Sequence, residues 1–243
     1  MKAMVLAAGL GTRLKPITDS RPKALVEIAG ESLLQITLMR LRQYGIYDVI
    51  VNVHHFADMI IKYLRTNENF GMRIAVSRED VLLDTGGGLK KAGWFFIQDS
   101  HDEPFVLHNV DVISTVDLQQ MVQFHLKNRA LVTLAVKSRQ TSRPLLFDDH
   151  LQLCGRGPSQ DPLKKSFAFS GIHVISPGLL PMLHEQGPFS IITSYLELAA
   201  RGERILAFGA DKYYWRDLGK PDDLRQAGED IKKGLVTAGD GPA

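Results

Sequence analysis

Cysteine is almost absent from this sequence: Cys154 is the single one among 243 residues, so no intrachain disulfide can form. That composition excludes a disulfide-stabilised secreted scaffold and suits a reducing compartment.

Excess charge is also missing, because the formal net charge is only +2. This excludes the broad cationic surface typical of proteins that bind nucleic acid or anionic membranes. No apolar run approaches the ~20 residues needed to span a bilayer, and the short run at residues 3–8 fits a buried strand better than a secretory leader. We therefore expect a cytoplasmic, soluble protein with no nucleic-acid or membrane partner.

The first half of the chain alternates between strand and helix patterns. Short apolar runs predict strands at residues 4–8, 48–53, 72–76, 104–107 and 130–136. Apolar residues at helical spacing, and a glycine triplet opening the third segment, predict helices at residues 32–44, 56–64, 86–95 and 114–127. Ser32 is placed to cap the first helix and Gly45 to end it, whereas Ser114 or Thr115 would cap the last. This alternation is typical of α/β proteins with a doubly wound, mostly parallel sheet.

The pattern changes after residue 137. Two short leucine-containing segments at residues 145–147 and 151–153 flank the polar residues 148–150 and predict a small hairpin. Further strands are expected at 167–175, 205–208 and 213–218, and helices at 190–201 and 221–233. We therefore expect a single three-layer αβα domain over residues 1–236 with a mixed central sheet. A disordered tail is expected at residues 237–243.

The most informative segment is the glycine-rich loop that follows the first strand. It lies at the carboxyl edge of the predicted sheet, where α/β proteins bind ligands. Gly9 and Gly11 allow the backbone N–H groups to approach a phosphate closely. Arg13 adds a planar array of donors and Lys23 a mobile positive charge. The loop therefore predicts a triphosphate site, since a structural turn alone does not call for this combination.

Two other kinds of phosphate loop do not fit. A Walker loop requires G-x-x-x-x-G-K-[ST], which the sequence lacks. A dinucleotide fingerprint requires glycine or alanine where Leu14 stands, and the second strand ends at Asn52 without a ribose-binding acid. A dehydrogenase is therefore excluded.

The loop closely resembles the sugar-1-phosphate nucleotidyltransferase family, with its pattern G-x-G-T-R-x-x-P-x-T-x-x-x-P-K. The fixed positions of that pattern are met by Gly9, Gly11, Thr12, Arg13, Pro16, Thr18, Pro22 and Lys23. The resemblance continues at residues 83–88, 109–111, 169–171 and 215–219, and so extends from residue 1 to about residue 233. It implies a Rossmann-like fold and an enzyme that joins a nucleoside triphosphate to a sugar 1-phosphate, releasing pyrophosphate.

The implied reaction is in-line attack by a sugar phosphate oxygen on the nucleotide α-phosphorus. A phosphate monoester needs no general base, because its second pKa is about 6. Positioning and positive charge should dominate instead. The resemblance makes Arg13 the group that holds the β- and γ-phosphates and Lys23 the one near the α-phosphate. It also implies a magnesium ion held by Asp111 and Asp217, a donor set that suits Mg²⁺ together with substrate phosphates.

The resemblance also implies the remaining binding residues. The expected nucleotide-binding residues are Ala8, Gly9, Gly11, Thr12, Arg13, Asp84, Thr85, Gly86, Gly87 and Asn109. The expected sugar-binding residues are Thr85, Asn109, Ser170 and Gly171. In the family, the turn matched by residues 86–88 reads the edge of the base through its backbone.

The sugar end departs from the family pattern. No Glu-Lys-Pro segment is present, so we expect Lys164 or Lys165 to replace its lysine. Among short relatives the chain looks most like N-acetylmuramate-1-phosphate uridylyltransferases, which favours UTP. GTP with mannose or heptose 1-phosphate is the alternative.

Two further hypotheses lie outside sugar activation. A regulatory subunit without turnover should have lost phosphate or metal residues, yet Arg13, Lys23, Asp111 and Asp217 are all present. A CTP-dependent enzyme acting on a cationic alcohol phosphate should carry an aromatic cage, to which residues 213–215 could contribute. The sequence does not give the oligomeric state.

Overall fold

The computed structural model describes residues 1–97 and 103–236. The predicted tail at residues 237–243 lies outside the described residues. Within them, no helix is both long and apolar enough to cross a membrane.

The four N-terminal strands of the main sheet run parallel. They are β1 (Lys2–Leu6), β4 (Asp48–Val53), β5 (Arg73–Arg78) and β6 (Phe105–Asn109), in the order β6-β1-β4-β5. Their side chains alternate between two cores, as a sheet covered on both faces requires. In β1, Ala3 and Val5 belong to one core and Met4 to the other.

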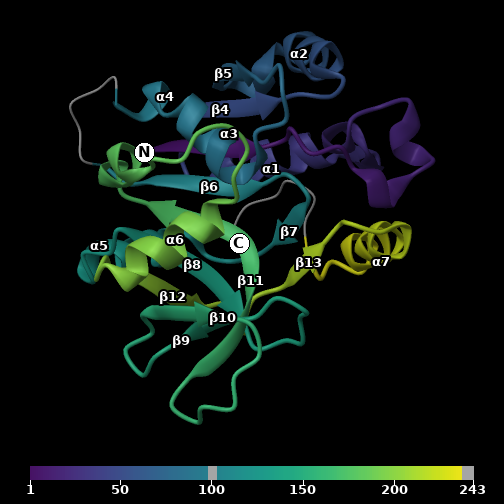
Figure 1. Ribbon diagram of the computed structural model, residues 1–243. Helices are drawn as coiled ribbons and strands as arrows, with labels where there is room; N and C mark the ends of the chain where they lie inside the picture. Colours follow the sequence, from purple (N-terminus) through teal and green to yellow (C-terminus); the bar gives the residue numbers. More distant parts are fainter. Residues whose placement is uncertain (98–102, 237–243) are drawn as a thin grey trace.

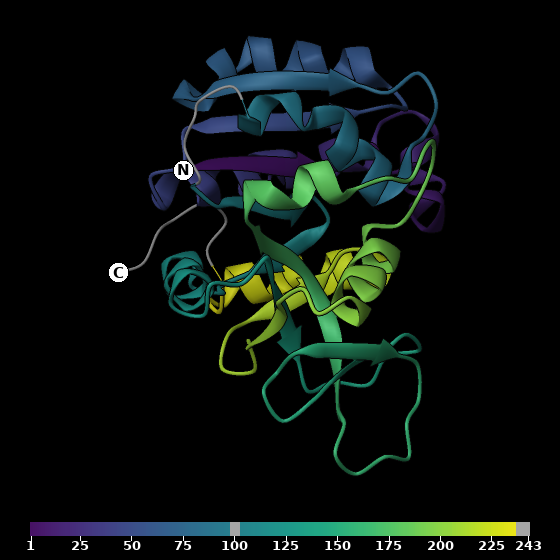
Figure 2. The ribbon, with the colours of Figure 1, turned by 60° about the vertical axis from the view of Figure 1, so that its left-hand side comes forward.

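The rest of the main sheet reverses direction, so the sheet is mixed as expected. Strand β11 (Lys165–Ile175) runs antiparallel to β6 and to β8 (Val132–Lys137), and β12 (Ile205–Gly209) lies parallel to β8. The predicted hairpin is present as β9 (Leu145–Phe147) and β10 (Leu153–Arg156), which extend the sheet along the first half of β11. Figures 1 and 2 show this hairpin projecting below the body of the molecule.

The helices connect these strands and cover the sheet on both sides (Figure 2). They are α1 (Leu33–Gln43), α2 (Ala57–Thr66), α3 (Asp84–Ala92), α4 (Trp94–Ile97), α5 (Leu118–Lys127), α6 (Ile191–Ala200) and α7 (Pro221–Lys232). Ser32 caps α1 as predicted, because its Oγ accepts from the N–H of Gln35 at 3.0 Å. Gly45 follows the helix with a φ of 73°, a conformation that glycine adopts without strain.

Two predicted helix starts are wrong. Helix α5 begins at Leu118 and is capped by Asp117, whose Oδ1 accepts from the N–H of Gln120 at 2.9 Å. Ser114, predicted to open it, is instead the last residue of β7 (Val112–Ser114), which pairs antiparallel with β13 (Trp215–Asp217). Helix α3 begins at Asp84, so the three glycines lie inside it and do not open it.

Short elements complete the chain. They are the strands β2 (Glu27–Ile28) and β3 (Glu31–Ser32) and the 3-10 helices η1 (Thr12–Leu14), η2 (Ile17–Asp19), η3 (Lys23–Leu25), η4 (Glu68–Gly71) and η5 (Pro177–Met182). In Figure 1 the N-terminal loops after β1, drawn in purple, and the β13–α7 segment, drawn in yellow, lie on the same side of the molecule. This is the side to which β1 carries the glycine-rich loop.

Candidate active site

The glycine-rich loop folds back on the residues that follow it. Gly11 has a φ of 66°, and a Cβ there would come within 2.9 Å of Thr18 Cγ2 and 3.0 Å of Lys23 Cβ. The hydroxyl of Thr18 donates to the Gly11 carbonyl at 2.9 Å. The loop therefore needs glycine at position 11 for two reasons, its left-handed backbone and its close packing on Thr18 and Lys23.

Lys23 connects this loop to the predicted metal residue Asp111. Its side chain is almost fully buried, and Nζ lies 2.5 Å from Asp111 Oδ2. A buried ammonium held against a carboxylate is poised to interact with phosphate, because its charge is poorly screened there. The structure thus brings together two predicted site residues that are 88 positions apart in the sequence.

The strand pair β7–β13 brings Asp217 to Asp111. Asp217 lies opposite Val112, the residue that follows Asp111. Burial raises the pKa of the Asp217 carboxyl, and the charge of Asp111 raises it further, while Lys23 and Arg13 partly offset this. The two carboxylates therefore repel each other across one space, which is the electrostatic setting of a cation site.

Arg13 reaches the same space from η1. A Cβ on Gly219 would lie 2.6 Å from Arg13 Nη2 and 2.5 Å from Asp217 Oδ1. The guanidinium and the carboxylate therefore meet over the Gly219 backbone. Arg13, Lys23, Asp111 and Asp217 all converge as the sequence predicts.

This arrangement fits magnesium. Among residues 1–97 and 103–236, no cluster of three or more His, Cys, Asp or Glu side chains is arranged to hold a metal ion. Mg²⁺ is commonly held by one or two carboxylates together with substrate phosphates and water. Asp111 and Asp217 supply that number, and the mutual repulsion of their charges favours a cation between them.

A cavity of about 440 Å³ extends from this cluster along the ends of β1, β4 and β6. It is lined by Leu6, Ala7, Ala8, Gly9, Lys23, Asn52, Leu82, Asp84, Thr85, Asn109, Val110, Asp111 and Pro188. The predicted residues Ala8, Gly9, Asp84, Thr85 and Asn109 are therefore in its wall. Gly11, Thr12, Arg13, Gly86 and Gly87 are not in that lining.

The glycines of α3 have a packing reason to lack side chains. A Cβ on Gly86 would lie 2.3 Å from Phe189 Cε2, and one on Gly87 would lie 2.6 Å from the Gly187 carbonyl. The Gly86 N–H already donates to the Phe189 carbonyl at 2.9 Å. Their proposed reading of the base stays a prediction.

The sequence analysis missed a buried polar network under this cavity. Asn52 Oδ1 accepts from the Ala7 N–H at 2.7 Å, and Asn52 Nδ2 donates to Glu79 Oε1 at 2.7 Å. The other carboxylate oxygen of Glu79 accepts from the Leu83 N–H at 3.0 Å. The network joins the ends of three segments that border the cavity. The sequence contains one indication of this network: Asn52 and Glu79 lie at the carboxyl ends of two consecutive strands, β4 and β5.

A second cavity of about 320 Å³ lies beyond Asn109, which lines both cavities. Its wall is formed by Asn109, Val112, Arg139, Thr141, Arg143, Leu145, Arg156, Phe169, Ser170, Gly171, Ser190, Ile192, Trp215 and Asp217. Three of the four predicted sugar-binding residues line this cavity: Asn109, Ser170 and Gly171. The fourth, Thr85, lines only the first cavity. Among the described residues, Asn109 Oδ1 and Ser170 Oγ are buried without a hydrogen-bond partner, so both are available to a ligand hydroxyl.

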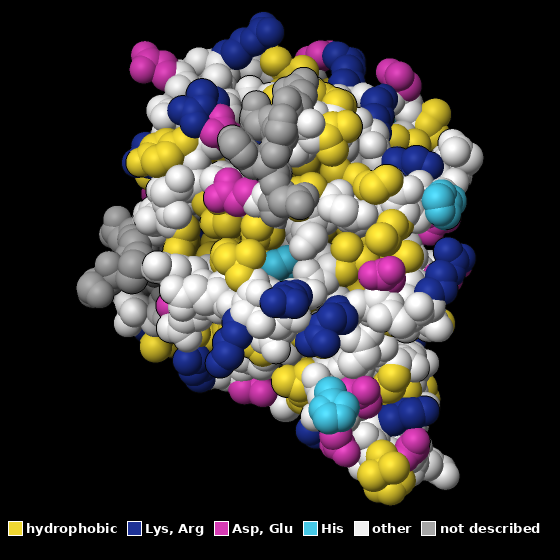
Figure 3. Space-filling view, turned by 90° about the vertical axis from the view of Figure 1, so that its left-hand side faces the viewer, with side chains coloured by type: hydrophobic (Ala, Val, Ile, Leu, Met, Phe, Trp, Pro, Cys, Tyr) yellow, Lys and Arg dark blue, Asp and Glu magenta, His cyan; other side chains and the backbone are white. Residues whose placement is uncertain are grey.

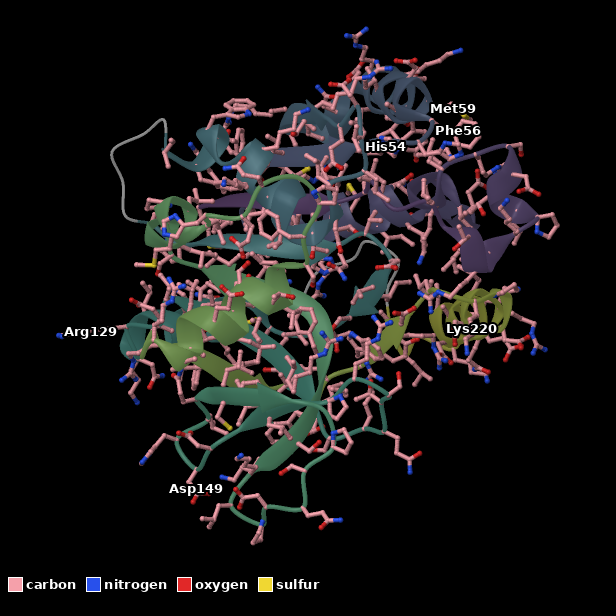
Figure 4. The ribbon with its side chains drawn as sticks, in the orientation of Figure 1. His54, Phe56, Met59, Arg129, Asp149 and Lys220 are labelled. Carbon is pink, nitrogen blue, oxygen red and sulfur yellow. The ribbon has the colours of Figure 1, made fainter. Side chains whose placement is uncertain are left out.

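Neither lysine expected to replace the Glu-Lys-Pro lysine lines this second cavity. Lys164 pairs with Asp161 at 3.7 Å and Lys165 with Asp149 at 3.5 Å. Asp149 lies on the projecting hairpin loop (Figure 4). The cations in the cavity wall are arginines 139, 143 and 156, which the sequence analysis did not consider.

The histidines at 54 and 55 do not form a joint site. His54 Nδ1 lies 2.9 Å from the Glu79 carbonyl, and the His55 ring packs on Phe56 at 3.9 Å between ring centres. Neither lines either of these two cavities. Figure 4 shows His54 and Phe56 near the N-terminal end of α2.

Comparison with known sequences identifies the family. The model of the nucleotidyl transferase family matches residues 2–147, which include the glycine-rich loop, Lys23 and Asp111. The chain belongs to the nucleotidyl transferase family. The family predicted from the loop pattern is thereby confirmed.

Several relatives of this nucleotidyl transferase have named activities. The chain is 35% identical to an N-acetylmuramate alpha-1-phosphate uridylyltransferase of Caulobacter vibrioides, over 90% of this chain and 92% of that enzyme. It is 29% identical to a UTP–glucose-1-phosphate uridylyltransferase of Synechocystis and to a mannose-1-phosphate guanyltransferase of Yarrowia lipolytica. It matches these two over 93% and 92% of its own length but spans only 62% of each of theirs.

Solved structures share the fold. HddC from Yersinia pseudotuberculosis, determined with GMP-PN, has a TM-score of 0.77 at 23% identity, covering 95% of this chain and 99% of that one. UDP-glucose pyrophosphorylase with UDP-glucose has a TM-score of 0.79 at 19% identity, covering 96% of this chain and 98% of that one. The Rossmann-like architecture with its mixed sheet is therefore confirmed.

Proposed function

We propose that this chain is a sugar-1-phosphate nucleotidyltransferase, which joins a nucleoside triphosphate to a sugar 1-phosphate and releases pyrophosphate. The observation that carries the proposal is the convergence of Arg13, Lys23, Asp111 and Asp217 where the two cavities meet. One cavity has room for a nucleotide beside the glycine-rich loop, and the other has unpaired polar groups for sugar hydroxyls.

The reaction follows from the charges at that junction. A nonbridging oxygen of the sugar phosphate forms a bond to the α-phosphorus, and the bond from that phosphorus to the bridging oxygen breaks. The electron pair leaves with pyrophosphate, so no covalent intermediate and no general base are required. Lys23 and Arg13 reduce the repulsion between the two anions and stabilise the charge that develops on the transferred group.

Asp111 and Asp217 are the residues that would hold the magnesium ion. When bound, the ion supplies charge neutralisation and orientation for the phosphates. Lys23 now neutralises Asp111 at 2.5 Å, so its ammonium can exchange between that carboxylate and a phosphate oxygen. Asp217 stays close to Arg13 over Gly219, which orients the guanidinium toward the same space.

Within this reaction class we propose UTP and N-acetylmuramate 1-phosphate as the substrate pair. Support comes from the Caulobacter vibrioides enzyme, which matches the chain over nearly its whole length. GTP with mannose or heptose 1-phosphate is the alternative, supported by the guanyltransferase relatives at 27–30% identity.

A cationic alcohol phosphate is less favoured because the aromatic residues do not form an open cage. The Trp215 ring is covered by the Arg139 guanidinium, 4.1 Å from the ring centre. The Tyr214 hydroxyl donates to Asp230 at 2.7 Å, and the Tyr213 hydroxyl to Gln120 at 3.1 Å. A cationic head group would meet an arginine where it needs an aromatic face.

The experiment that tests this proposal is pyrophosphate release with Mg²⁺, crossing the four nucleoside triphosphates with a panel of sugar 1-phosphates. We expect release with one nucleotide and one sugar phosphate well above all other pairs, with UTP and N-acetylmuramate 1-phosphate leading. Release only with GTP and mannose or heptose 1-phosphate would replace the proposed pair. Nucleotide binding without release from any sugar phosphate would contradict the reaction class.

A further inference from the structure

The wall of the second cavity contains more positively charged side chains than are required to bind one phosphate group. Arg139, Arg143 and Arg156 line it, and Asp217 is the one carboxylate in its described wall. Asp217 lies beside Arg13, and its charge also acts on Arg139, so this one carboxylate faces an excess of guanidinium groups. Three guanidinium groups in one small cavity indicate an anionic ligand with more than one charged group.

Arg139 belongs to the reacting end of this cavity. Its guanidinium stacks on the Trp215 ring at 4.1 Å and donates to the Phe169 carbonyl at 3.2 Å. Trp215 is itself fixed by a hydrogen bond of 2.7 Å from Nε1 to the Ser170 carbonyl. Since Trp215 and Asp217 are on the same strand, Arg139 is held near the point of transfer and is placed to bind the 1-phosphate.

Arg143 and Arg156, which we call the outer pair, line the cavity from the lobe that carries β9 and β10, and both are exposed. Arg156 lies on β10 opposite Leu145 of β9, and the Gly157 N–H donates to the Pro144 carbonyl at 2.9 Å. The two arginines therefore sit on adjoining backbone segments, one residue away from this hydrogen bond. Like charges on neighbouring backbone segments repel each other, and an anion bound between them offsets that repulsion.

No carboxylate of the described residues forms an ion pair with Arg143 or Arg156. The acids on the same lobe are engaged elsewhere, because Asp161 pairs with Lys164 and Asp149 with Lys165. The fold thus leaves the two guanidinium groups of the outer pair for a ligand, while it neutralises the lysines beside them.

We propose that Arg143 and Arg156 form a subsite for a second anionic group on the sugar 1-phosphate, a group distinct from the phosphate that reacts. This inference rests on the proposed function. Arg139 binds the reacting phosphate, the sugar ring lies against Ser170 and Gly171, and the far side of the sugar presents its second anion to the outer pair. The matching substrates are sugar 1-phosphates with a carboxylate or a second phosphate, and neutral hexose 1-phosphates lack the group.

The test compares four sugar phosphates that differ mainly in this charge. They are N-acetylmuramate 1-phosphate, its methyl ester, N-acetylglucosamine 1-phosphate and N-acetylglucosamine 1,6-bisphosphate. We measure kcat/KM by pyrophosphate release, and Kd of each sugar phosphate by calorimetry without nucleotide, so that no turnover occurs. The acid or the bisphosphate should be favoured about tenfold or more over the uncharged counterparts, as expected for charge-assisted hydrogen bonds. Preference for the acid identifies a carboxylate as the second anion, and preference for the bisphosphate identifies a phosphate.

Variants decide whether the outer pair causes this preference. For each variant we measure the same ratio of kcat/KM, and of Kd, between the charged and the uncharged sugar phosphates. Arg143→Ala and Arg156→Ala should each bring the ratio toward one, and Arg143→Lys should restore part of it. Arg65→Ala, an exposed arginine at the end of α2, is the matched control and should keep the wild-type ratio. A wild-type ratio near one, or a high ratio that survives both alanine variants, overturns the inference. Because Kd is measured without turnover, absence of pyrophosphate release would contradict the proposed function and leave this comparison decisive.

Discussion

The carbonyl oxygen of Asp111 accepts a hydrogen bond from the backbone N–H of Leu218 at 2.8 Å. This bond extends the pairing of β7 with β13 by one step and fixes the two acidic residues side by side. The two carboxylates proposed to hold the cation are therefore positioned by backbone pairing between segments far apart in the sequence. Changes that disturb this pairing, or the groups packed on it, should affect nucleotide transfer before they affect the rest of the fold.

Gly219→Ala tests the contact between Arg13 and Asp217. The new Cβ would lie 2.5 Å from Asp217 Oδ1 and 2.6 Å from Arg13 Nη2, so one of the two groups must move. We expect kcat/KM for the nucleoside triphosphate to fall about tenfold or more, since donors to transferring phosphates are sensitive to small displacements. Gly178→Ala, where a Cβ meets nothing within 4 Å, is the control and should retain wild-type kinetics. Equal kinetics in both variants would show that this contact has no role in transfer.

Asn52→Ala tests the network under the nucleotide cavity. The variant leaves the Ala7 N–H without its acceptor and removes a donor from the buried Glu79 carboxylate. We expect a loss of about 2–4 kcal/mol in the free energy of unfolding, measured with urea, and a higher KM for the nucleotide. Asn67→Ala removes only an exposed bond to the Tyr63 carbonyl and should change stability by less than about 0.5 kcal/mol. A mild effect of Asn52→Ala on both quantities would argue against the network.

Asp230→Ala tests how α7 supports β13. The buried Asp230 carboxylate accepts from the Tyr214 hydroxyl at 2.7 Å, from Arg216 Nη2 at 2.9 Å and from Gln226 Nε2 at 2.9 Å. Its removal leaves Arg216 without its ion pair one residue before Asp217, so the free energy of unfolding should fall. We also expect a higher Mg²⁺ concentration at half-maximal activity, a change that a purely structural residue would not produce. Asp222→Ala, at an exposed position of the same helix, should alter neither value.

Acid should destabilise the protein through a buried histidine far from the candidate site. Burial lowers the pKa of His125 from 6.5 to about 4, while its ring nitrogens lie 3.0 Å from the hydroxyls of Thr133 and Ser176. The unfolded chain takes up the proton first, so this stability is present above pH 6.5 and is lost as the pH falls toward 4. The lowering of the His125 pKa corresponds to a change of ~3 kcal/mol in the free energy of unfolding over this pH range. The free energy of unfolding of His125→Gln should depend less on pH across this range; a wild-type slope in the variant would contradict the assignment.

The sequence predicted most of the fold because local patterns determine its elements. The bounds of β4 were predicted correctly, since its mostly apolar sequence, at residues 49–51 and 53, fits a strand covered on both faces. The start of α5 was misplaced because residues 112–114 pair with β13, a long-range contact that no local pattern reveals.

The candidate site was predictable where a contiguous motif carried it. Lys23 and the glycines belong to one loop pattern, and Asp217 could be joined to Asp111 only through a family resemblance. The arginine pair at 143 and 156 was missed because it depends on the β9–β10 register, and the role of Glu79 depends on burial. Single exposed arginines look alike in a sequence until their neighbours are known.

The expected absence of a nucleic-acid or membrane partner stays a prediction. On the face shown in Figure 3, Lys and Arg side chains are interspersed with Asp and Glu. The cytoplasmic location stays a prediction.

The most direct test of the central claim is pyrophosphate release by Asp111→Asn with Mg²⁺, nucleoside triphosphate and sugar 1-phosphate. Asp149→Asn, on the projecting hairpin loop (Figure 4), is the matched control. We expect kcat/KM to fall about 100-fold or more in Asp111→Asn, because both the proposed cation site and the partner of Lys23 lose a charge. The control should match wild type. Release by Asp111→Asn within threefold of wild type would contradict the account.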